Sequence, residues 1–386
     1  MLFKPRTPIG LDIGSSTVKA LQMRQTSRGV VLERFGMAEI FPSGQKKKDP
    51  EAVRQAKVQA IKKALAAGGF NTTQAVTSVS GESIIVRYIQ LPSMPEEELK
   101  NALRWEAEEY IPFPIDEVNI DSAILGHTAD GSKVDVLLVS ARKDHVQQHV
   151  DLLQQAGLQP VVIDVDAFAF MNCFEYNHEP SPNDVIGLIN IGAEVTSINI
   201  YMGGASRFSR DVPIAGDAIT HAIQSRLNHE FHEADSLKVR VGLPEPALSG
   251  DGSQEGLKER SLIETIRGTM DKLSGQDLVE DTPDAIAAKV IKNTVNSLIN
   301  EIKRSIQFFE NQAGGVEVKR LVIGGGTAKL KNIAPFMQAE LNLPVEFIDP
   351  LRRVGIESKN VNQSQLMDNR HLIGVGVGLA LRRVID

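Results

Sequence analysis

Residues 8–21 read PIGLDIGSSTVKAL, with apolar residues on both sides of a short turn centred on Gly14-Ser15-Ser16. Apolar runs around such a glycine turn predict a β-hairpin. Glycine at position 14 permits a turn with positive φ and a close approach of the backbone to a bound group. The N–H groups of Gly14, Ser15 and Ser16 would then point at an anion such as a phosphate. Asp12, at the strand end, would then hold Mg²⁺ through water. The alternative is a hairpin whose aspartate only caps the turn.

A second stretch repeats this design. Residues 185–201 read VIGLINIGAEVTSINIY, and aligning Asn190 with Asp12 also aligns Gly192 with Gly14. Two such hairpins, about 178 residues apart, predict a duplicated fold of two similar lobes. Two unrelated hairpins remain the alternative.

Between the hairpins, residues 81–160 predict a compact α+β insert. Its expected elements are a strand (82–90), a helix that ends before Pro112, two strands (119–128 and 133–140) and a helix (144–156). Ser93 is expected to cap the first helix, with Pro95 in its first turn.

The region after the second hairpin predicts a helical lobe. Its expected elements are a helix from Gly216, a mobile loop (241–283) with a short helix (260–273), a long helix (284–311), a strand (321–326), a helix from Lys331 and a closing helix (372–383).

Three further features suit a nucleotide. The strand at 321–326 ends in Gly324-Gly325-Gly326 and Thr327, and bare backbone there lets a flat ring or a sugar approach. Gly216 precedes a helix whose N-terminus can face phosphate or ribose. Asp235 and Lys238, three residues apart on a helix, can reach ribose and adenine. A simple tight turn and an exposed salt-bridged pair are the alternatives for the glycines and for Asp235/Lys238.

The composition excludes several classes of protein. The chain has 386 residues, 42% of them hydrophobic and 24% charged, which suits two or three globular domains and excludes wholesale disorder. A net charge of −7 argues against a general nucleic-acid binder, which needs a basic stripe. No apolar run approaches the ~20 residues that span a bilayer, and the start lacks a secretory signal, so a cytoplasmic protein is expected.

Three other residue types have ordinary interpretations. His145 and His149 have the i, i+4 spacing of metal ligands, but no third ligand is spaced to complete a site. The single cysteine, Cys173, is expected in the core, and Trp105 is expected to be partly buried against the insert.

In order and spacing, these segments resemble the actin-like ATPase fold that actin shares with heat-shock 70 chaperones and sugar kinases. GLDIGSST looks like the first phosphate motif, INIGAEVTSI the second and LVIGGGTAKL the adenosine motif. VVIDVDAFAF (161–170) and LIGVGVGLAL (372–381) resemble the two connecting helices. The resemblance implies an α/β, ribonuclease H-like, duplicated two-lobe fold that binds ATP and Mg²⁺ between its lobes. The residues it implies for nucleotide binding are Gly14, Ser15, Ser16, Thr17, Lys19, Asn190, Gly192, Ala193, Gly216, Asp235, Lys238, Gly324, Gly325, Gly326 and Thr327.

Within this superfamily the chain is most similar to the PilM family of type IV pilus assembly proteins. The runs that carry the resemblance are LPSMPEEELKNALRWEAEEYIPFPIDEV (91–118), IDVDAFAFMNCFE (163–175), HEADSLKVRVG (232–242) and INEIKRSIQFFENQ (299–312). The cell-division protein FtsA carries a comparable insert but needs an amphipathic C-terminal tail, which is expected to be absent here. The resemblance divides the chain into a lobe-one core (1–80 and 161–184), the insert (81–160), a lobe-two core (185–218 and 315–386) and an upper subdomain (219–314).

One position departs from the superfamily pattern. The second phosphate motif usually carries an aspartate that orients magnesium and the attacking water, whereas this chain has Asn190. An amide brings no charge, so the metal contact at Asn190 should be weak and ATP should be bound with slow or negligible turnover. Asp164 and Asp166 lie near the usual water-positioning residue, although capping of the next helix is the alternative. Asp12, Asp164 and Asp166 are therefore the catalytic candidates.

The resemblance also implies partners. A groove between lobe one and the insert would take the cytoplasmic N-terminal peptide of the membrane protein PilN. The protein would then link the inner-membrane complex to the motor ATPase of pilus assembly, touching the membrane only through partners and binding no nucleic acid. A related secretion or competence system, a sugar or acyl-phosphate kinase and an FtsA-like division protein remain alternatives, and the oligomeric state stays open.

Overall fold

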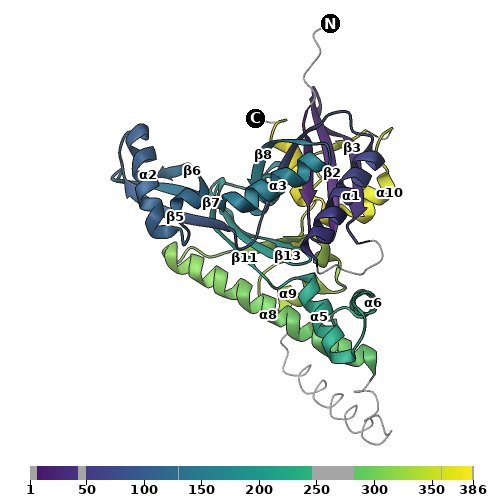
Figure 1. The fold of residues 1–386 in the computed structure, drawn as a ribbon. Helices are drawn as coiled ribbons and strands as arrows, with labels where there is room; N and C mark the ends of the chain where they lie inside the picture. Colours follow the sequence, from purple (N-terminus) through teal and green to yellow (C-terminus); the bar gives the residue numbers. More distant parts are fainter. Residues whose placement is uncertain (1–6, 42–48, 129, 246–281, 358, 385–386) are drawn as a thin grey trace, which may run out of the picture.

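The computed structural model describes residues 7–41, 49–128, 130–245, 282–357 and 359–384. These residues form two mixed sheets with helices around them, and a third, smaller sheet that projects to one side (Figure 1). Residues 246–281 hold most of the predicted loop at 241–283 and all of its short helix, so those predictions lie outside the described residues.

The sheet of lobe one has the strand order β14-β3-β2-β1-β4-β8. Strands β1 to β3 are antiparallel neighbours, whereas β4 and β8 continue the sheet parallel to β1. The strands are β1 (Ile9–Ile13), β2 (Thr17–Thr26), β3 (Gly29–Glu39), β4 (Gln74–Val79), β8 (Gln159–Val165) and β14 (Gly355–Ile356). Helix α1 (Pro50–Gly68) lies between β3 and β4 in the chain and packs on β2 and β3.

The sheet of lobe two repeats this topology in the order β11-β10-β9-β12-β13. Strands β9 to β11 are again antiparallel, and β12 and β13 are again parallel to the first strand. The strands are β9 (Val185–Ile191), β10 (Thr196–Met202), β11 (Ala205–Val212), β12 (Arg320–Gly324) and β13 (Val345–Phe347). If the strands of each lobe are numbered in chain order, without those of the insert, both sheets contain the order 3-2-1-4-5. The predicted duplication is therefore confirmed.

Two helices connect the lobes, as the sequence predicts. Helix α4 (Asp166–His178) runs from β8 of lobe one to β9 of lobe two, and α11 (Gly374–Leu381) packs beside it and against β1 and β2. Any Cβ at Gly378 would overlap the carbonyl oxygen of Ala169, so glycine is what lets the two helices touch at backbone distance. None of the helices in the described ranges combines the length and apolar character that crossing a bilayer requires.

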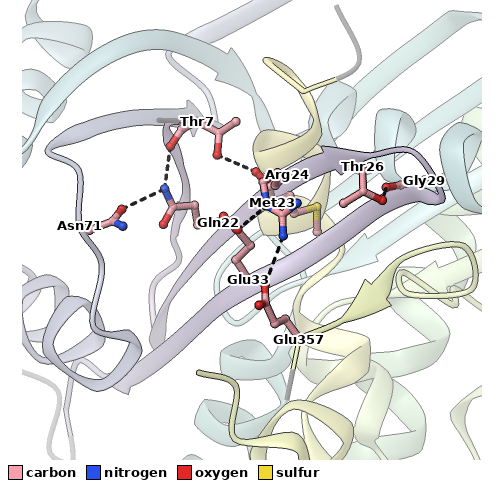
Figure 2. Close-up of polar contacts among 9 residues, drawn as sticks. All are labelled: Thr7, Gln22, Met23, Arg24, Thr26, Gly29, Glu33, Asn71 and Glu357. Carbon is pink, nitrogen blue, oxygen red and sulfur yellow. Dashed lines mark hydrogen bonds and ion pairs between the residues drawn. The ribbon is translucent and has the colours of Figure 1, made fainter. Parts of the chain in front are cut away.

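Polar contacts join a C-terminal segment of the chain to the sheet of lobe one (Figure 2). Arg24 on β2 pairs with Glu33 on β3 at 2.5 Å and with Glu357 at 3.5 Å. The N–H of Glu357 donates to the carbonyl of Leu32 at 3.0 Å. Strand β14, within the segment predicted for the lobe-two core, is thus the outer strand of the lobe-one sheet.

The insert has its own core. Its sheet, in the order β5-β7-β6, is antiparallel and carries helix α2 (Glu96–Tyr110) on one face, through Leu99, Leu103 and Ala107. The strands are β5 (Ile84–Pro92), β6 (Val118–His127) and β7 (Lys133–Arg142), with a short 3-10 turn at Ile115–Glu117. The prediction that Ser93 caps α2 is wrong, because the helix begins after Pro95 and has no side-chain cap. The partial burial predicted for Trp105 is also wrong: it lies 75% exposed, on the side of α2 turned away from the sheet.

Helix α3 (Lys143–Gln155) follows the insert but packs elsewhere. Leu152 and Leu153 are buried in one cluster with Ile9 of β1 and Ile61 of α1. The hydrophobic core of the insert therefore ends with β7, before the predicted boundary at residue 160.

The upper part of lobe two is helical. Helix α8 (Pro283–Gln312) runs the length of this lobe from the side of the insert to α5 and α6 (Figure 1). The remaining elements are α5 (Gly216–Leu227), α6 (Phe231–Val241), η3 (Gly326–Lys329), α9 (Ile333–Leu341), α10 (Gln363–Asp368) and η4 (Arg370–Leu372). The long helix predicted over 284–311 is confirmed to within one residue at each end.

Candidate functional site

The first turn, between β1 and β2, carries a buried ion pair. Asp12 lies opposite Lys19 in the strand register, and Lys19 Nζ is 3.1 Å from Asp12 Oδ2. Both residues are buried. Burial raises the pKa of Asp12 above its usual value, as does the nearby carboxylate of Asp166, while Lys19 acts in the opposite direction. Lys19 is thus the positive charge that faces Asp12.

The first turn does not use the conformational freedom of Gly14. Its φ is not positive, so the left-handed conformation that glycine permits is not adopted. Glycine matters here for space: a Cβ would lie 3.1 Å from the Thr17 carbonyl oxygen and 3.4 Å from Lys19 Nζ. The Gly14 N–H donates to that same carbonyl at 3.1 Å. Within the turn, the amides left for an anion are therefore those of Ser15 and Ser16.

The second turn, between β9 and β10, has the same closing bond. The Gly192 N–H donates to the Val195 carbonyl at 3.0 Å, as Gly14 does to Thr17. Where lobe one pairs Asp12 with Lys19, the strand register of lobe two places Asn190 opposite Ser197. The two turns therefore have the same closing hydrogen bond, but the pair beside the first turn is charged and the pair beside the second turn is neutral.

Three elements converge on the second turn. The Gly192 carbonyl accepts hydrogen bonds from Thr327 Oγ1 at 2.6 Å and from the Gly216 N–H at 3.2 Å. The Ala193 carbonyl accepts from the Asp217 N–H at 2.7 Å. The first amides of α5 are thus used by the turn, in contrast to the prediction that they face a ligand. This arrangement fixes η3 and α5 against the turn.

Helix α6 adds Asp235 and Lys238 to this cluster. Lys238 Nζ lies 2.5 Å from Asp235 Oδ1, 2.9 Å from Thr220 Oγ1 and 3.3 Å from the Gly216 carbonyl oxygen. The Lys238 side chain is 12% exposed and the Asp235 side chain 45% exposed, so the alternative of an exposed salt bridge holds for the aspartate but not for the lysine. Lys238 instead holds α6 against the start of α5.

The three glycines after β12 are not equivalent. A Cβ at Gly324 would lie 2.8 Å from the Phe170 ring, and one at Gly325, whose φ is +92°, would overlap the Ile191 carbonyl. Gly325 also donates its N–H to the carbonyl of His371 at 2.8 Å. At Gly326, by contrast, no atom of the described residues beyond its chain neighbours lies within 4 Å of the Cβ position. Only Gly326 faces open space.

The two candidate aspartates at the start of α4 have different surroundings. The helix begins at Asp166 after Val165, and neither aspartate caps it, so the capping alternative is wrong. Asp166 accepts a hydrogen bond from Ser78 Oγ at 2.5 Å, and its charge raises the pKa of both Asp12 and Asp211. Asp164 lies 3.4 Å from Arg382 Nε. Of the two, only Asp166 is thus placed with Asp12.

Sequence reasoning did not find Asp211. This residue lies on β11 and accepts a hydrogen bond from the Gly81 N–H at 2.7 Å, across the boundary between lobe two and the insert. Burial is the main cause of its raised pKa. No local pattern marks it, because its partner is 130 residues away in the chain.

Metal binding through a protein-only cage is not indicated. In the described ranges no group of three or more histidine, cysteine, aspartate or glutamate side chains is placed to hold a metal ion. Mg²⁺ needs no such cage, because it retains several waters and takes one or two carboxylates together with phosphate oxygens. The buried carboxylate of Asp12, with Asp166 nearby, is compatible with that donor set.

A cleft of about 290 Å³ lies between the insert and lobe two. Its walls come from β5 and β11, each the terminal strand of its sheet in the part of the chain that the structure describes, and from Val165 before α4. The Gly81–Asp211 bond lies at one end, and beyond the cleft Tyr88 Oη and Ser206 Oγ are 2.5 Å apart. A hollow of about 340 Å³ between α5 and α8 has none of the predicted site residues in its lining.

His149 on α3 lies against Thr77 of β4, which in turn is bonded to β1. The Thr77 hydroxyl donates to the Leu11 carbonyl at 2.9 Å and lies 3.0 Å from His149 Nε2. The Thr77 hydroxyl has one proton and gives it to the Leu11 carbonyl, so His149 Nε2 must carry a hydrogen and donate it to Thr77. A neutral imidazole can do this, whereas a protonated imidazole would also bring a charge into a buried site. Burial, with smaller effects of His145 and Lys57, lowers the pKa of His149 from 6.5 to about 4.

This histidine predicts a loss of stability in acid. The unfolded chain binds a proton as the pH falls through 6.5, whereas folded His149 resists it until about pH 4. The free energy of unfolding should therefore fall across that window, by about 3 kcal/mol. Urea unfolding at pH 7 and pH 4.5 should show a smaller difference in H149Q than in the wild type. In H127Q, at an exposed position, the difference should persist; an unaltered difference in H149Q would contradict the assignment.

Comparison with known proteins agrees with this geometry. The family described as "Type IV pilus assembly protein PilM" matches residues 10–249 and 269–384. A chain of the solved PilM–PilN type IV pilus biogenesis complex is 28% identical, with a TM-score of 0.77, over 98% of this chain and 99% of that one. MreB5 of Spiroplasma citri bound to AMPPNP shares the fold alone, at 13% identity and a TM-score of 0.51, over 99% and 97% of the two chains. The predicted actin-like fold is thereby confirmed.

The curated relatives are cell-division proteins. FtsA of Pseudomonas aeruginosa is 23% identical over 400 residues, which cover 97% of this chain and 88% of that protein. The match with FtsA of Buchnera aphidicola, at 25% identity, covers 47% of this chain and only 40% of that protein. These similarities agree with the predicted likeness to FtsA.

Proposed function

Because the chain belongs to the PilM family of type IV pilus assembly proteins, we propose that it is an ATP-binding adaptor of that machinery. The observation that supports ATP binding best is the repeated turn: Gly14 and Gly192 close the same bond at the ends of two sheets with the same strand order. Two such turns, one from each lobe, would grip a triphosphate from both sides.

The nucleotide would lie against both lobes. Ser15 and Ser16 would offer amides to the phosphates, with Thr17 and Lys19 behind them on β2. Thr327 and Gly216 already meet at the Gly192 carbonyl, which places the triple glycine beside the second turn. Gly326 faces open space, where a ring or ribose would lie. Asp235 and Lys238 would complete the adenosine side.

Magnesium would be held mainly from lobe one. Asp12 would take it through water, while Asn190 brings only a neutral amide and Ser197 opposite it brings no charge. The metal would supply charge neutralisation for the phosphates. Asp166, fixed by Ser78, is the residue best placed to orient a water near Asp12.

This asymmetry predicts weak turnover. We expect phosphate release from ATP below about 0.1 per second, against roughly 1–1000 per second for typical enzymes. The measurement is phosphate release by purified full-length protein that calorimetry has shown to bind ATP. Turnover at the rate of a metabolic kinase would remove the adaptor proposal in favour of an enzyme.

The partner would be an extended peptide in the cleft between β5 and β11, which lies between the insert and lobe two and not, as the resemblance implies, between the insert and lobe one. Terminal strands offer unpaired backbone groups to an added strand, and Ile84 and Val86 offer apolar contacts. The solved relative is described as a PilM–PilN complex, so the peptide is proposed to be the cytoplasmic N-terminus of a PilN-type membrane protein. Through it the protein would sit in the cytoplasm at the inner membrane and link the membrane complex to the assembly motor.

A further inference from the structure

The connector that leads from β4 into the insert is held from two sides. Ser78, at the end of β4, donates to Asp166 on the helix between the lobes at 2.5 Å. Three residues later the Gly81 N–H donates to Asp211 on lobe two at 2.7 Å. Gly81 has a φ of +92° and no atom within 4 Å of its Cβ position, so the chain turns there without packing around it. The root of the insert is therefore positioned by hydrogen bonds to two carboxylates.

Asp211 also belongs to a row of side chains that begins at the second turn. In the strand register Asn190 lies opposite Ser197, and Ser197 lies opposite Asp211. Directly paired residues of antiparallel strands project on the same face, so the three form a continuous polar row across β9, β10 and β11. Asn190, beside the second turn, is thus separated from Asp211 by one intervening serine.

A second carboxylate, that of Asp166 at the start of α4, lies between the two lobes and is held by Ser78. It is near enough to raise the pKa of both Asp12 of lobe one and Asp211 of lobe two. Asp211 therefore has neighbours from both turns, Asp166 on one side and the Asn190–Ser197 row on the other, and it accepts the hydrogen bond from the Gly81 amide. Ile84 and Val86, which line the cleft, lie directly after this connector.

We propose that Asp211 couples the nucleotide state of the lobe junction to the cleft between β5 and β11, through its bond to the Gly81 amide. This inference rests on the proposed function, because it needs ATP at the turns. A ligand shifts a conformational equilibrium only by its differential contacts with the two states. Asp211 provides such a difference: its bond is made across the boundary that lobe movement displaces. By reciprocity, a peptide in the cleft would alter the affinity for ATP by the same factor.

Hydrogen exchange of the full-length chain tests the nucleotide half of the coupling without a peptide. In the wild type, saturating ATP with Mg²⁺ should change amide exchange in residues 79–87 by about threefold or more. D211A should lose this response while still binding ATP in calorimetry. D121A, which removes an exposed carboxylate from β6 of the same insert, should respond as the wild type does. If D211A does not fold, D211N decides, with a reduced response.

A labelled peptide of the PilN-type N-terminus tests the other half. Its affinity for the wild type should change by about fivefold or more with ATP, and for D211A by less than about twofold. An ATP response in D211A or D211N equal to that of the wild type overturns the inference. So does a wild type that binds ATP yet shows no change at 79–87. Failure of the wild type to bind the peptide, with the exchange response intact, instead removes the proposed partner and leaves the Asp211 link standing.

Discussion

Gly326→Phe is expected to abolish ATP binding while leaving the fold intact. No atom of the described chain beyond the adjoining residues lies within 4 Å of the Cβ position of Gly326, and its φ is not positive, so a side chain can leave the backbone there without a clash at Cβ or backbone strain. The ring would instead fill the space proposed for the adenosine group. We expect the dissociation constant to rise at least about 100-fold, or about 3 kcal/mol.

Titration calorimetry with ATP and Mg²⁺ measures this effect, and thermal unfolding checks the fold. G326A is the matched control, because one methyl group at the same position should weaken binding much less than a ring. Substitution of Gly325 would be a poorer test, since a Cβ there would overlap the Ile191 carbonyl and disturb the folded chain. Unchanged ATP affinity in G326F would place the nucleotide away from the triple glycine.

Val86→Asp is expected to abolish binding of the partner peptide. Val86 is half-buried and lines the cleft on β5, where a carboxylate would have to be desolvated against an incoming strand. The loss should be at least about 50-fold, or about 2.3 kcal/mol. ATP binding should be retained, because β5 contributes none of the residues proposed for the nucleotide.

Fluorescence anisotropy of a labelled PilN-type N-terminal peptide gives the affinity, and co-purification with the membrane partner gives a second readout. I124D is the matched control: Ile124 is an apolar residue of the same sheet, 51% exposed on β6 and outside the cleft. Deletion of the first residues of the partner should act like V86D. Peptide binding that is equal in V86D and I124D would locate the partner on another surface.

Much of the fold follows from local patterns. The hairpins around Gly14 and Gly192, the long helix α8 and the insert strands all begin and end close to their expected positions. Side-chain periodicity and turn residues act over a few residues, so they can be recognised in the sequence without knowledge of tertiary contacts. Their errors are local as well: Ser93 was expected to cap α2, but the chain enters the helix from Pro95 without a side-chain cap.

The candidate site was predictable in its residue types but not in its contacts. The glycine turns and the triple glycine are visible as motifs, and the structure brings Gly192, Gly216 and Thr327 together. Position alone could not tell Asp164 from Asp166, or Gly325 from Gly326. The members of each pair differ in which distant residues lie against them, and Gly325 differs from Gly326 also in its φ of +92°.

The sequence by itself predicts two similar lobes and a separate insert, because duplication leaves motifs that can be aligned and each element has its own periodicity. The packing of α3 against lobe one, the return of β14 to the first sheet and the bond from Gly81 to Asp211 arise only once the chain is folded. Those contacts join residues far apart in the chain through single hydrogen bonds or shared burial. Interactions of that kind impose no spacing on the sequence, so only the three-dimensional arrangement reveals them.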